Sequence, residues 1–298
     1  MAVRLKLETN SFIRGKNMFC ILYGIASALS WGVADFAGGL ASRKMSLYLV
    51  VFYGYIVGLL ALLLAVALYP EALPEPESLM FAGLAGITGS LSLLVLFHSM
   101  ASGQMSIAAP VSALFAATLP IVVGICTQGL PDAMQFVGFG FALLAVCLIS
   151  IGDIKQPFHL DRLSNLLLPV LAGIGFGCSF IAMHCAISAN ASVILLMIAS
   201  YMAGTLMTFM FVKIRRESFA IKANALGVVL IHVVFNVGGN FFYIQALKTG
   251  RLDISSALGS LYPGATVMLA WLILKERLYL TQWVGIVAAL VAIMLFTM

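Results

Sequence analysis

One carboxylate, Asp35, lies well inside a long apolar stretch of the chain. An ionised Asp at the centre of a membrane-spanning helix costs about 2.5–3.5 kcal/mol on insertion scales, so its presence needs a reason. Two interpretations stay open. The first is structural: the side chain forms an ion pair or reaches a hydrated helix end near Arg43 and Lys44. The second is functional: the side chain contacts a substrate amine or is a protonation site for coupling.

A stripe of polar side chains recurs at helical spacing later in the chain. His232, Asn236 and Asn240 are four residues apart, and Tyr243 follows three residues later. Residues at this spacing share one face of a helix. The stripe either makes hydrogen bonds between helices, worth about 0.6 kcal/mol each in membranes, or it lines a cavity and orients a polar ligand. We favour the cavity because all four groups share one face.

Two isolated histidines and one tryptophan are further candidate binding residues. His98 and His184 stand alone on apolar segments, where a histidine is more often a packed hydrogen-bond donor than a ligand-binding group. We keep both as candidates for contact with a solute. Trp31 is a candidate for the aromatic wall of a cavity, although aromatic side chains also form belts at membrane interfaces.

The segment around Pro263 combines small, polar and helix-breaking residues. Proline removes a backbone hydrogen bond from a helix, and Ser260 with its neighbouring glycines would ease bending there. The sequence therefore predicts a hinge that borders a cavity. Ser260 and Tyr262 complete the set of candidate substrate-binding residues.

Motifs for intramembrane catalysis and for metal binding do not occur in the sequence, which contains no GxGD, GxSxG or HExxH. The five cysteines form no CxxC pair and lie in or beside apolar segments, so neither a metal site nor a disulfide framework is predicted. An embedded hydrolase would need a partner group for Asp35, and the sequence offers no second carboxylate for it. We predict no enzyme activity and no cofactor.

The composition sets the class of protein that must position these residues. Apolar residues make up 62% of the chain and charged residues only 9%, against about 25% charged in ordinary soluble domains. Uncharged runs such as 133–152 and 223–247 are long enough to cross a bilayer, because about 20 apolar residues span its hydrocarbon core. Continuous runs without alternation favour helices over a barrel. The fold class predicted is an all-α membrane protein.

We predict ten transmembrane helices joined by short loops that leave no room for a catalytic domain outside the membrane. The predicted helices cover 18–41, 47–69, 78–100, 106–126, 133–152, 164–187, 191–212, 223–247, 254–274 and 279–298. The net charge of +5 lies in tails and loops, which favours contact with anionic lipid and gives no sign of nucleic-acid binding.

From about residue 94 onward, the second half of the chain repeats the first at an offset of 147 residues without a gap. Gly103 corresponds to Gly250, and Gly138 corresponds to Gly285. In the first helix of each half the offset is 145, so that Phe180 occupies the position equivalent to Asp35. A duplicated set of apolar helices is typical of membrane carriers.

The repeat divides the chain into a basic N-terminal tail (1–17), a first half (18–152), a linker (153–163) and a second half (164–298). Each half holds five predicted helices. Because five is odd, the second half must enter the membrane inverted relative to the first. A site between two inverted halves can be exposed to either side by equivalent rearrangements, which is the geometry of alternating access.

The segment from Ser255 to Gly285 reads SSALGSLYPGATVMLAWLILKERLYLTQWVG. Its Tyr262-Pro263 step and its Glu276-Arg277 pair, together with Trp31-Gly32 in the first helix, resemble the EamA-type family of the drug/metabolite transporter superfamily. The first half departs from this pattern, since Gly129 stands in the place of Glu276. The resemblance implies a ten-helix carrier for small metabolites, often an exporter, with a central cavity between the halves.

We therefore expect a multi-pass secondary transporter in a plasma membrane, the inner membrane in a bacterium. Its expected partners are the bilayer, a small-molecule solute such as an amino acid or a nucleoside-like compound, and a coupled proton. The alternative is a non-transporting regulatory or structural membrane subunit. That alternative predicts a stable complex with a protein partner and no stabilisation by solutes.

Overall fold

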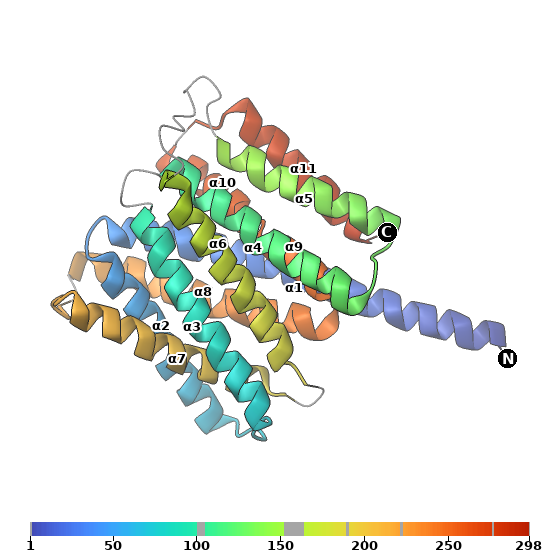
Figure 1. The fold of residues 1–298 in the computed structure, drawn as a ribbon, viewed down its shortest axis with the longest axis horizontal. Helices are drawn as coiled ribbons and strands as arrows, with labels where there is room; N and C mark the ends of the chain where they lie inside the picture. The colour runs from blue at the N-terminus through green and yellow to red at the C-terminus, as the bar shows by residue number, and fades with distance from the viewer. Residues whose placement is uncertain are drawn as a thin grey trace.

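The computed structural model describes residues 2–99, 105–151, 164–188, 191–220, 223–275 and 277–297, and the elements within these ranges are all helices (Figure 1). The predicted linker and Glu276 lie outside the described residues. The helices are α1 (Ala2–Ser42), α2 (Leu47–Leu68), α3 (Pro76–Ser99), α4 (Met105–Gln128), α5 (Ala133–Ile151), α6 (Ser164–Ala186), α7 (Val193–Ile214), α8 (Ala223–Thr249), α9 (Leu252–Gly259), α10 (Tyr262–Leu274) and α11 (Leu280–Thr297).

Nine segments in the described part of the chain are long and apolar enough to cross a membrane. They coincide with nine of the ten spans that the sequence predicts. The tenth, in α5, has a shorter apolar stretch at Ala133–Ile149. Large apolar side chains such as Leu64, Leu206 and Val234 are exposed on the outside of the helices, as expected for surfaces that face lipid rather than water. The protein is thus a multi-pass membrane protein.

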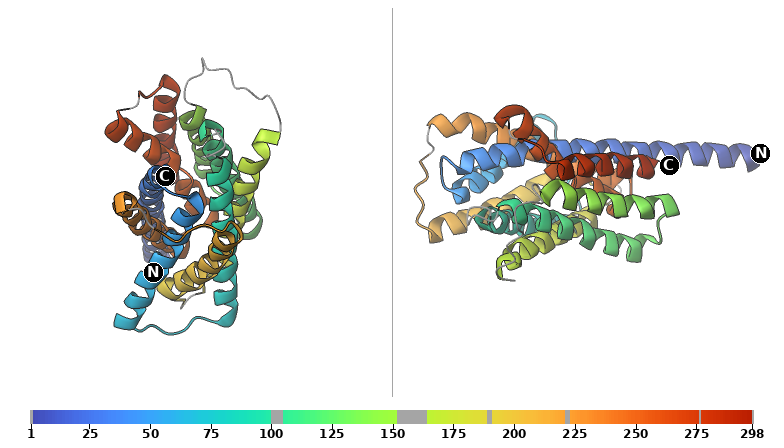
Figure 2. Two further views of the ribbon diagram at one scale, coloured as in Figure 1. Left: turned by 90° about the vertical axis from the view of Figure 1, so that its left-hand side faces the viewer. Right: turned by 90° about the horizontal axis from the view of Figure 1, so that it is seen from above.

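Helix α1 is longer than the span predicted for it. It begins at Ala2 instead of residue 18, and its N-terminal part extends beyond the rest of the bundle (Figures 1 and 2). No proline interrupts residues 2–17, so nothing in the sequence of the basic segment stops the helix.

The ninth predicted span is broken into two helices. Helix α9 ends at Gly259, and α10 begins at Tyr262 with Pro263 in its first turn. Proline is tolerated at that position because the first turn of a helix has no partner for its N–H. The kink predicted near Ser260 is therefore a complete interruption of the helix.

The start of α9 corrects one prediction. The predicted span begins at residue 254, whereas α9 begins at Leu252 and includes Asp253, whose side chain is fully buried. Asp253 is thus a second carboxylate within a helix, but it lies in the first turn, whereas Asp35 lies well inside α1. The charge of Asp253 is tolerated because Arg251 pairs with it at 2.7 Å and because it lies in the first turn, where the helix dipole favours an anion.

The packing of the helices follows the repeat. In chain order α1, α2 and α3 correspond to α6, α7 and α8, while α4 corresponds to α9 with α10. Helix α1 packs against α8, and the equivalent pair, α6 and α3, also packs together. Helix α4 contacts α6, as α9 and α10 contact α1. The pairs α2 with α7 and α5 with α11 each join equivalent helices. The two repeats therefore form one bundle in which these contacts occur in equivalent pairs.

Candidate functional site

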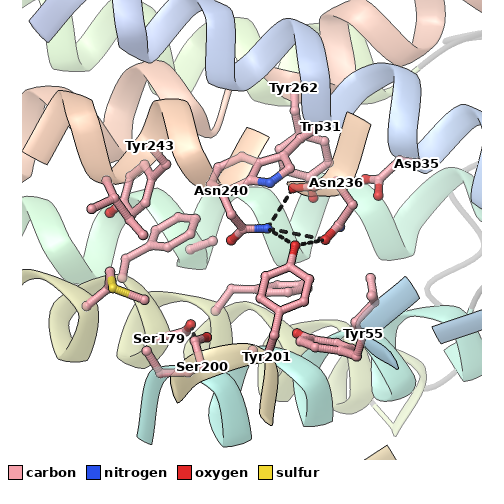
Figure 3. Close-up of a pocket in the computed structure, with 18 residues that line it drawn as sticks. Trp31, Asp35, Tyr55, Ser179, Ser200, Tyr201, Asn236, Asn240, Tyr243 and Tyr262 are labelled. Atoms are coloured by element: carbon pink, nitrogen blue, oxygen red, sulfur yellow. Dashed lines mark hydrogen bonds between the residues drawn. The ribbon is translucent and has the colours of Figure 1, made fainter. Parts of the chain in front are cut away.

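A cavity lies among the central helices, with side chains from both halves in its wall (Figure 3). The space open to the centres of water-sized spheres is about 90 Å³, several times the ~10–15 Å³ that a single water needs. The lining residues are Trp31, Asp35, Tyr55, Ala85, Gly89, Leu93, Ala116, Phe176, Ser179, Phe180, Met183, Ser200, Tyr201, Asn236, Asn240, Tyr243, Ile244 and Tyr262.

Asp35, on α1, is the one charged residue in this lining. Its carboxylate makes no hydrogen bond or ion pair with any residue that the structure describes. Arg43 and Lys44 are exposed, and the Lys44 Nζ donates to the main-chain oxygen of Asn224 at 3.0 Å. The ion pair considered from the sequence is therefore not formed with these two residues, and the carboxylate faces the cavity.

Two amides and a tyrosine hydroxyl form a hydrogen-bonded cluster beside Asp35 (Figure 3). The Tyr201 Oη donates to Asn236 Oδ1 at 2.8 Å. The Asn240 Nδ2 donates to Tyr201 Oη at 3.2 Å and to the main-chain oxygen of Asn236 at 2.8 Å. These bonds fix the amides of α8 against α7. They leave Asn236 Nδ2 and Asn240 Oδ1 without a partner among the described residues, so the cluster offers both a donor and an acceptor.

Three aromatic rings form another part of the wall. Trp31 stacks on Phe180 with ring centroids 5.6 Å apart and an interplanar angle of 7°. Tyr243 lies against both, at 5.3 Å from Trp31 and 4.6 Å from Phe180, and its hydroxyl is hydrogen-bonded to Ser256 Oγ at 2.8 Å. Gly239 makes room for the indole, since a Cβ there would overlap it. These contacts pack the three rings and fix them in position.

A pair of tyrosines joins the two halves at the cavity. The rings of Tyr55 on α2 and Tyr201 on α7 are 5.2 Å apart. Each ring packs on a glycine of the other half, Tyr55 on Gly204 and Tyr201 on Gly58, where a Cβ would overlap the ring. Tyr55 is not among the candidate residues predicted from the sequence. A repeated motif could have identified it, because Tyr-x-x-Gly occurs at 55–58 and again at 201–204 in the equivalent helix.

Six of the ten candidate residues from the sequence lie together in the lining. They are Trp31, Asp35, Asn236, Asn240, Tyr243 and Tyr262. The other four lie outside it.

His232 belongs to the polar stripe but does not reach the cavity. Its side chain is fully buried, and its Nδ1 is hydrogen-bonded to the main-chain oxygen of Ala34 at 2.8 Å. The imidazole fills the space beside Gly38 and Gly54, where an added Cβ would come within about 3 Å of it. At this level α1 and α2 approach α8 closely, so the ring packs between helices instead of lining a cavity.

The remaining three candidates are at the ends of elements. The His184 Nε2 is 3.1 Å from Gln128 Nε2, which links α6 to the end of α4. His98 is exposed near the end of α3. Ser260 is buried at the break between α9 and α10, and its Oγ has no partner among the described residues.

A second polar cluster joins the end of α4 to the start of α9. The Arg251 Nε and Nη2 donate to the Asp253 carboxylate at 3.1 and 2.7 Å. The same guanidinium donates to the main-chain oxygens of Gln128 and Gly129 at 3.2 and 2.7 Å. The hydrogen bond to Asp253 raises the pKa of Arg251, which therefore stays charged. The Gln128 Oε1 accepts from the backbone N–H of Leu252 at 3.1 Å. We call these groups the Arg251 latch.

Comparison with known proteins identifies a matching family and solved structures of similar fold. A model of the EamA-like transporter family matches residues 18–151 and again residues 163–298. No curated protein matches the chain significantly. One solved structure that the chain resembles, described as "Crystal structure of protein", has a TM-score of 0.77 at 13% sequence identity, over 93% of this chain and 95% of that chain. At that identity the likeness is one of fold alone.

Proposed function

Since the chain belongs to the EamA-like transporter family, with a match over each of its halves, we propose that it is a secondary transporter that exports a small metabolite across a plasma membrane. The observation that carries the proposal is the cavity between the two halves. Its wall contains side chains from six equivalent helices, α1 with α6, α2 with α7 and α3 with α8. A site shared by both halves can be opened toward either side of the membrane by equivalent movements.

The proposed mechanism is alternating access between two inverted halves of five spans each. An odd number of spans in each half supports the inversion, and the paired packing of equivalent helices supports an axis that relates them. In the described structure the Arg251 latch holds α4 against α9. We propose that these bonds break when the cavity opens toward that end of the molecule.

We propose that the solute binds between the Asp35 carboxylate, the amides of Asn236 and Asn240, and the rings of Trp31 and Tyr243. A bare carboxylate facing a cavity inside a membrane is costly unless it is paired or protonated. Asp35 would therefore take up a proton when the solute leaves, and this exchange supplies the coupling to a proton. The hydroxyl of Tyr262 completes the polar edge of the site.

Reconstitution of the purified protein in liposomes tests the function. We expect solute-dependent flux for the wild type, and about 2- to 10-fold weaker apparent affinity for Asn240→Leu, because that change removes one hydrogen-bonding group from the site. Leucine is the residue at the equivalent position of the first half, Leu93. Thr297→Ala is the matched control, since its hydroxyl bonds only within its own helix, to Met294.

The non-transporting subunit makes the opposite prediction. It requires that no solute of a broad panel is carried and that none raises the melting temperature of the protein in detergent, whereas a ligand that binds the folded state must raise it. That pair of negative results would overturn the transporter proposal.

A further inference from the structure

The two walls of the cavity differ in polarity although they are built from equivalent helices. On α8 the lining residues are Asn236 and Asn240, whose amides belong to the hydrogen-bonded cluster. The equivalent positions on α3, at the offset of 147 residues, are Gly89 and Leu93. Both of these also line the cavity. The polar face of α8 is thus opposed by an apolar face of α3.

The same difference separates α1 from α6. Asp35 on α1 corresponds to Phe180 on α6, at the offset of 145 residues, and both side chains line the cavity. Trp31 corresponds in the same way to Phe176. A serine on this side, Ser179, donates its hydrogen bond to the main-chain oxygen of Ala85 at 2.8 Å, so its polarity is used within the wall. The cavity therefore has a polar wall on α1 and α8 and an apolar wall on α3 and α6.

The charge in the cavity is uncompensated. Asp35 is the only acidic residue of the lining, and the lining contains no Lys, Arg or His. Two cationic side chains of the described chain already have other partners. Lys44 donates to the main-chain oxygen of Asn224, and Arg251 pairs with Asp253. A carboxylate that faces a cavity enclosed by apolar helices must be paired or protonated. Because the lining contains no cation, the partner of the ionised Asp35 carboxylate must come with the solute.

We propose that the solute is a small organic monocation, an amine with an aromatic or aliphatic body and no carboxylate. Its ammonium group binds Asp35, and its body lies against Phe176, Phe180 and Leu93. This inference rests on the proposed transport function and narrows it to one class of substrate.

The same arrangement disfavours the other classes of solute. The carboxylate of an amino acid would enter a site whose only charge is negative, with no cationic side chain in the lining to receive it. A neutral nucleoside would leave the Asp35 carboxylate unpaired. Of the solute classes considered, only a cation pairs the charge and fills the apolar wall at once.

Four probes that share a phenethyl body and differ in charge test the proposal on the purified wild-type protein in detergent. Phenethylamine is a cation, phenylalanine a zwitterion, N-acetylphenethylamine neutral and 3-phenylpropionate an anion. We expect phenethylamine to raise the melting temperature in a dose-dependent way and the other three to leave it unchanged. Cyclohexylamine and benzyltrimethylammonium extend the cation set to other bodies. A stabilisation by phenylalanine or 3-phenylpropionate that equals or exceeds that by the amines would overturn the proposal, as would no stabilisation by any of the three cations.

Variants at Asp35 then test whether its negative charge is what recognises the cation. Asp35→Asn is expected to weaken binding of phenethylamine about 10- to 100-fold, the loss of a charge-assisted hydrogen bond, while Asp35→Glu retains the preference for cations. Equal affinity of wild type and Asp35→Asn for phenethylamine would contradict the assignment. If Asp35→Asn does not fold, the probe series on the wild type still decides.

Flux measurements separate this inference from the proposed function. Amines that bind but are not carried into liposomes would support the cation site and contradict the proposed transport function. Transport of phenylalanine, with neither binding nor transport of amines, would support the transport function and contradict the cation site.

Discussion

At the scale of single residues, the relation between the two halves extends to individual side chains. Tyr55 and Tyr201 occupy equivalent positions, lie 5.2 Å apart and each pack on the glycine of the opposite half. A tyrosine ring fits there only because Gly58 and Gly204 carry no Cβ. Small residues at such spacing let membrane helices approach closely, and here they also give the rings room at the cavity wall.

Adding one methyl group at the tyrosine pair should therefore destabilise the protein. The Cβ added by Gly204→Ala overlaps ring carbons of Tyr55. Overpacking of this kind costs about 1–3 kcal/mol of stability. The matched control is Gly140→Ala in α5, where an added Cβ meets nothing within 4 Å. It should be neutral or stabilise by up to ~1 kcal/mol through helix propensity. The two variants are compared by unfolding in detergent, and equal effects of both would contradict the packing described here.

Part of the site could be predicted from residue types alone. Asp35, Asn236 and Asn240 could be identified because polar groups inside apolar helices are costly and rare. Tyr55 could not be identified by polarity, since a tyrosine in an apolar helix looks like ordinary packing, and only comparison of the two halves reveals it. His232 satisfies the same spacing rule as the asparagines, yet it packs beside Gly38 and Gly54. A period along one helix does not tell how closely its neighbours approach at each turn.

At the scale of elements, the interrupted ninth span and the Arg251 latch are the two features that distinguish α9 from an ordinary membrane helix. The proline at 263 indicated a bend, and the break lies next to it at Ser260–Leu261. The latch could not be predicted, because Asp253 lies at the edge of the apolar run. Its partner Arg251 bonds in turn to the main-chain oxygens of Gln128 and Gly129, 123 and 122 residues away in sequence. Long-range hydrogen bonds of this kind leave no periodic signal.

Breaking one side of the latch should cost more than removing both charges. Arg251→Gln leaves the buried Asp253 carboxylate unpaired, which is expected to destabilise the protein by about 3–5 kcal/mol. The double variant Arg251→Gln with Asp253→Asn leaves no buried charge and should recover a large part of this loss. Unfolding of the single and double variants in detergent measures the coupling. A double variant as unstable as the sum of the single changes would show that the two charges are not coupled.

At the scale of the whole molecule, the internal repeat predicted the architecture well. The two-repeat, all-helical fold and nearly all span positions could be predicted because length and hydropathy alone define a membrane helix. Which residues meet at the centre could not be predicted in the same way, since that depends on how helices of one half pack on those of the other. The extension of α1 to Ala2 was also missed, because a polar helix outside the hydrocarbon has no apolar run to mark it.

The central claim is that the two halves have opposite orientations and share one cavity, and the loops that follow α4 and α10 test it most directly. Leu130 and Arg277 are equivalent positions in these loops, and both are exposed. In a background with all five native cysteines replaced, each is changed to cysteine and labelled with an impermeant maleimide in right-side-out and in inverted membrane vesicles. We predict that Leu130→Cys and Arg277→Cys react from opposite sides of the membrane. Labelling of both from the same side would contradict the inverted repeat and, with it, the alternating-access mechanism.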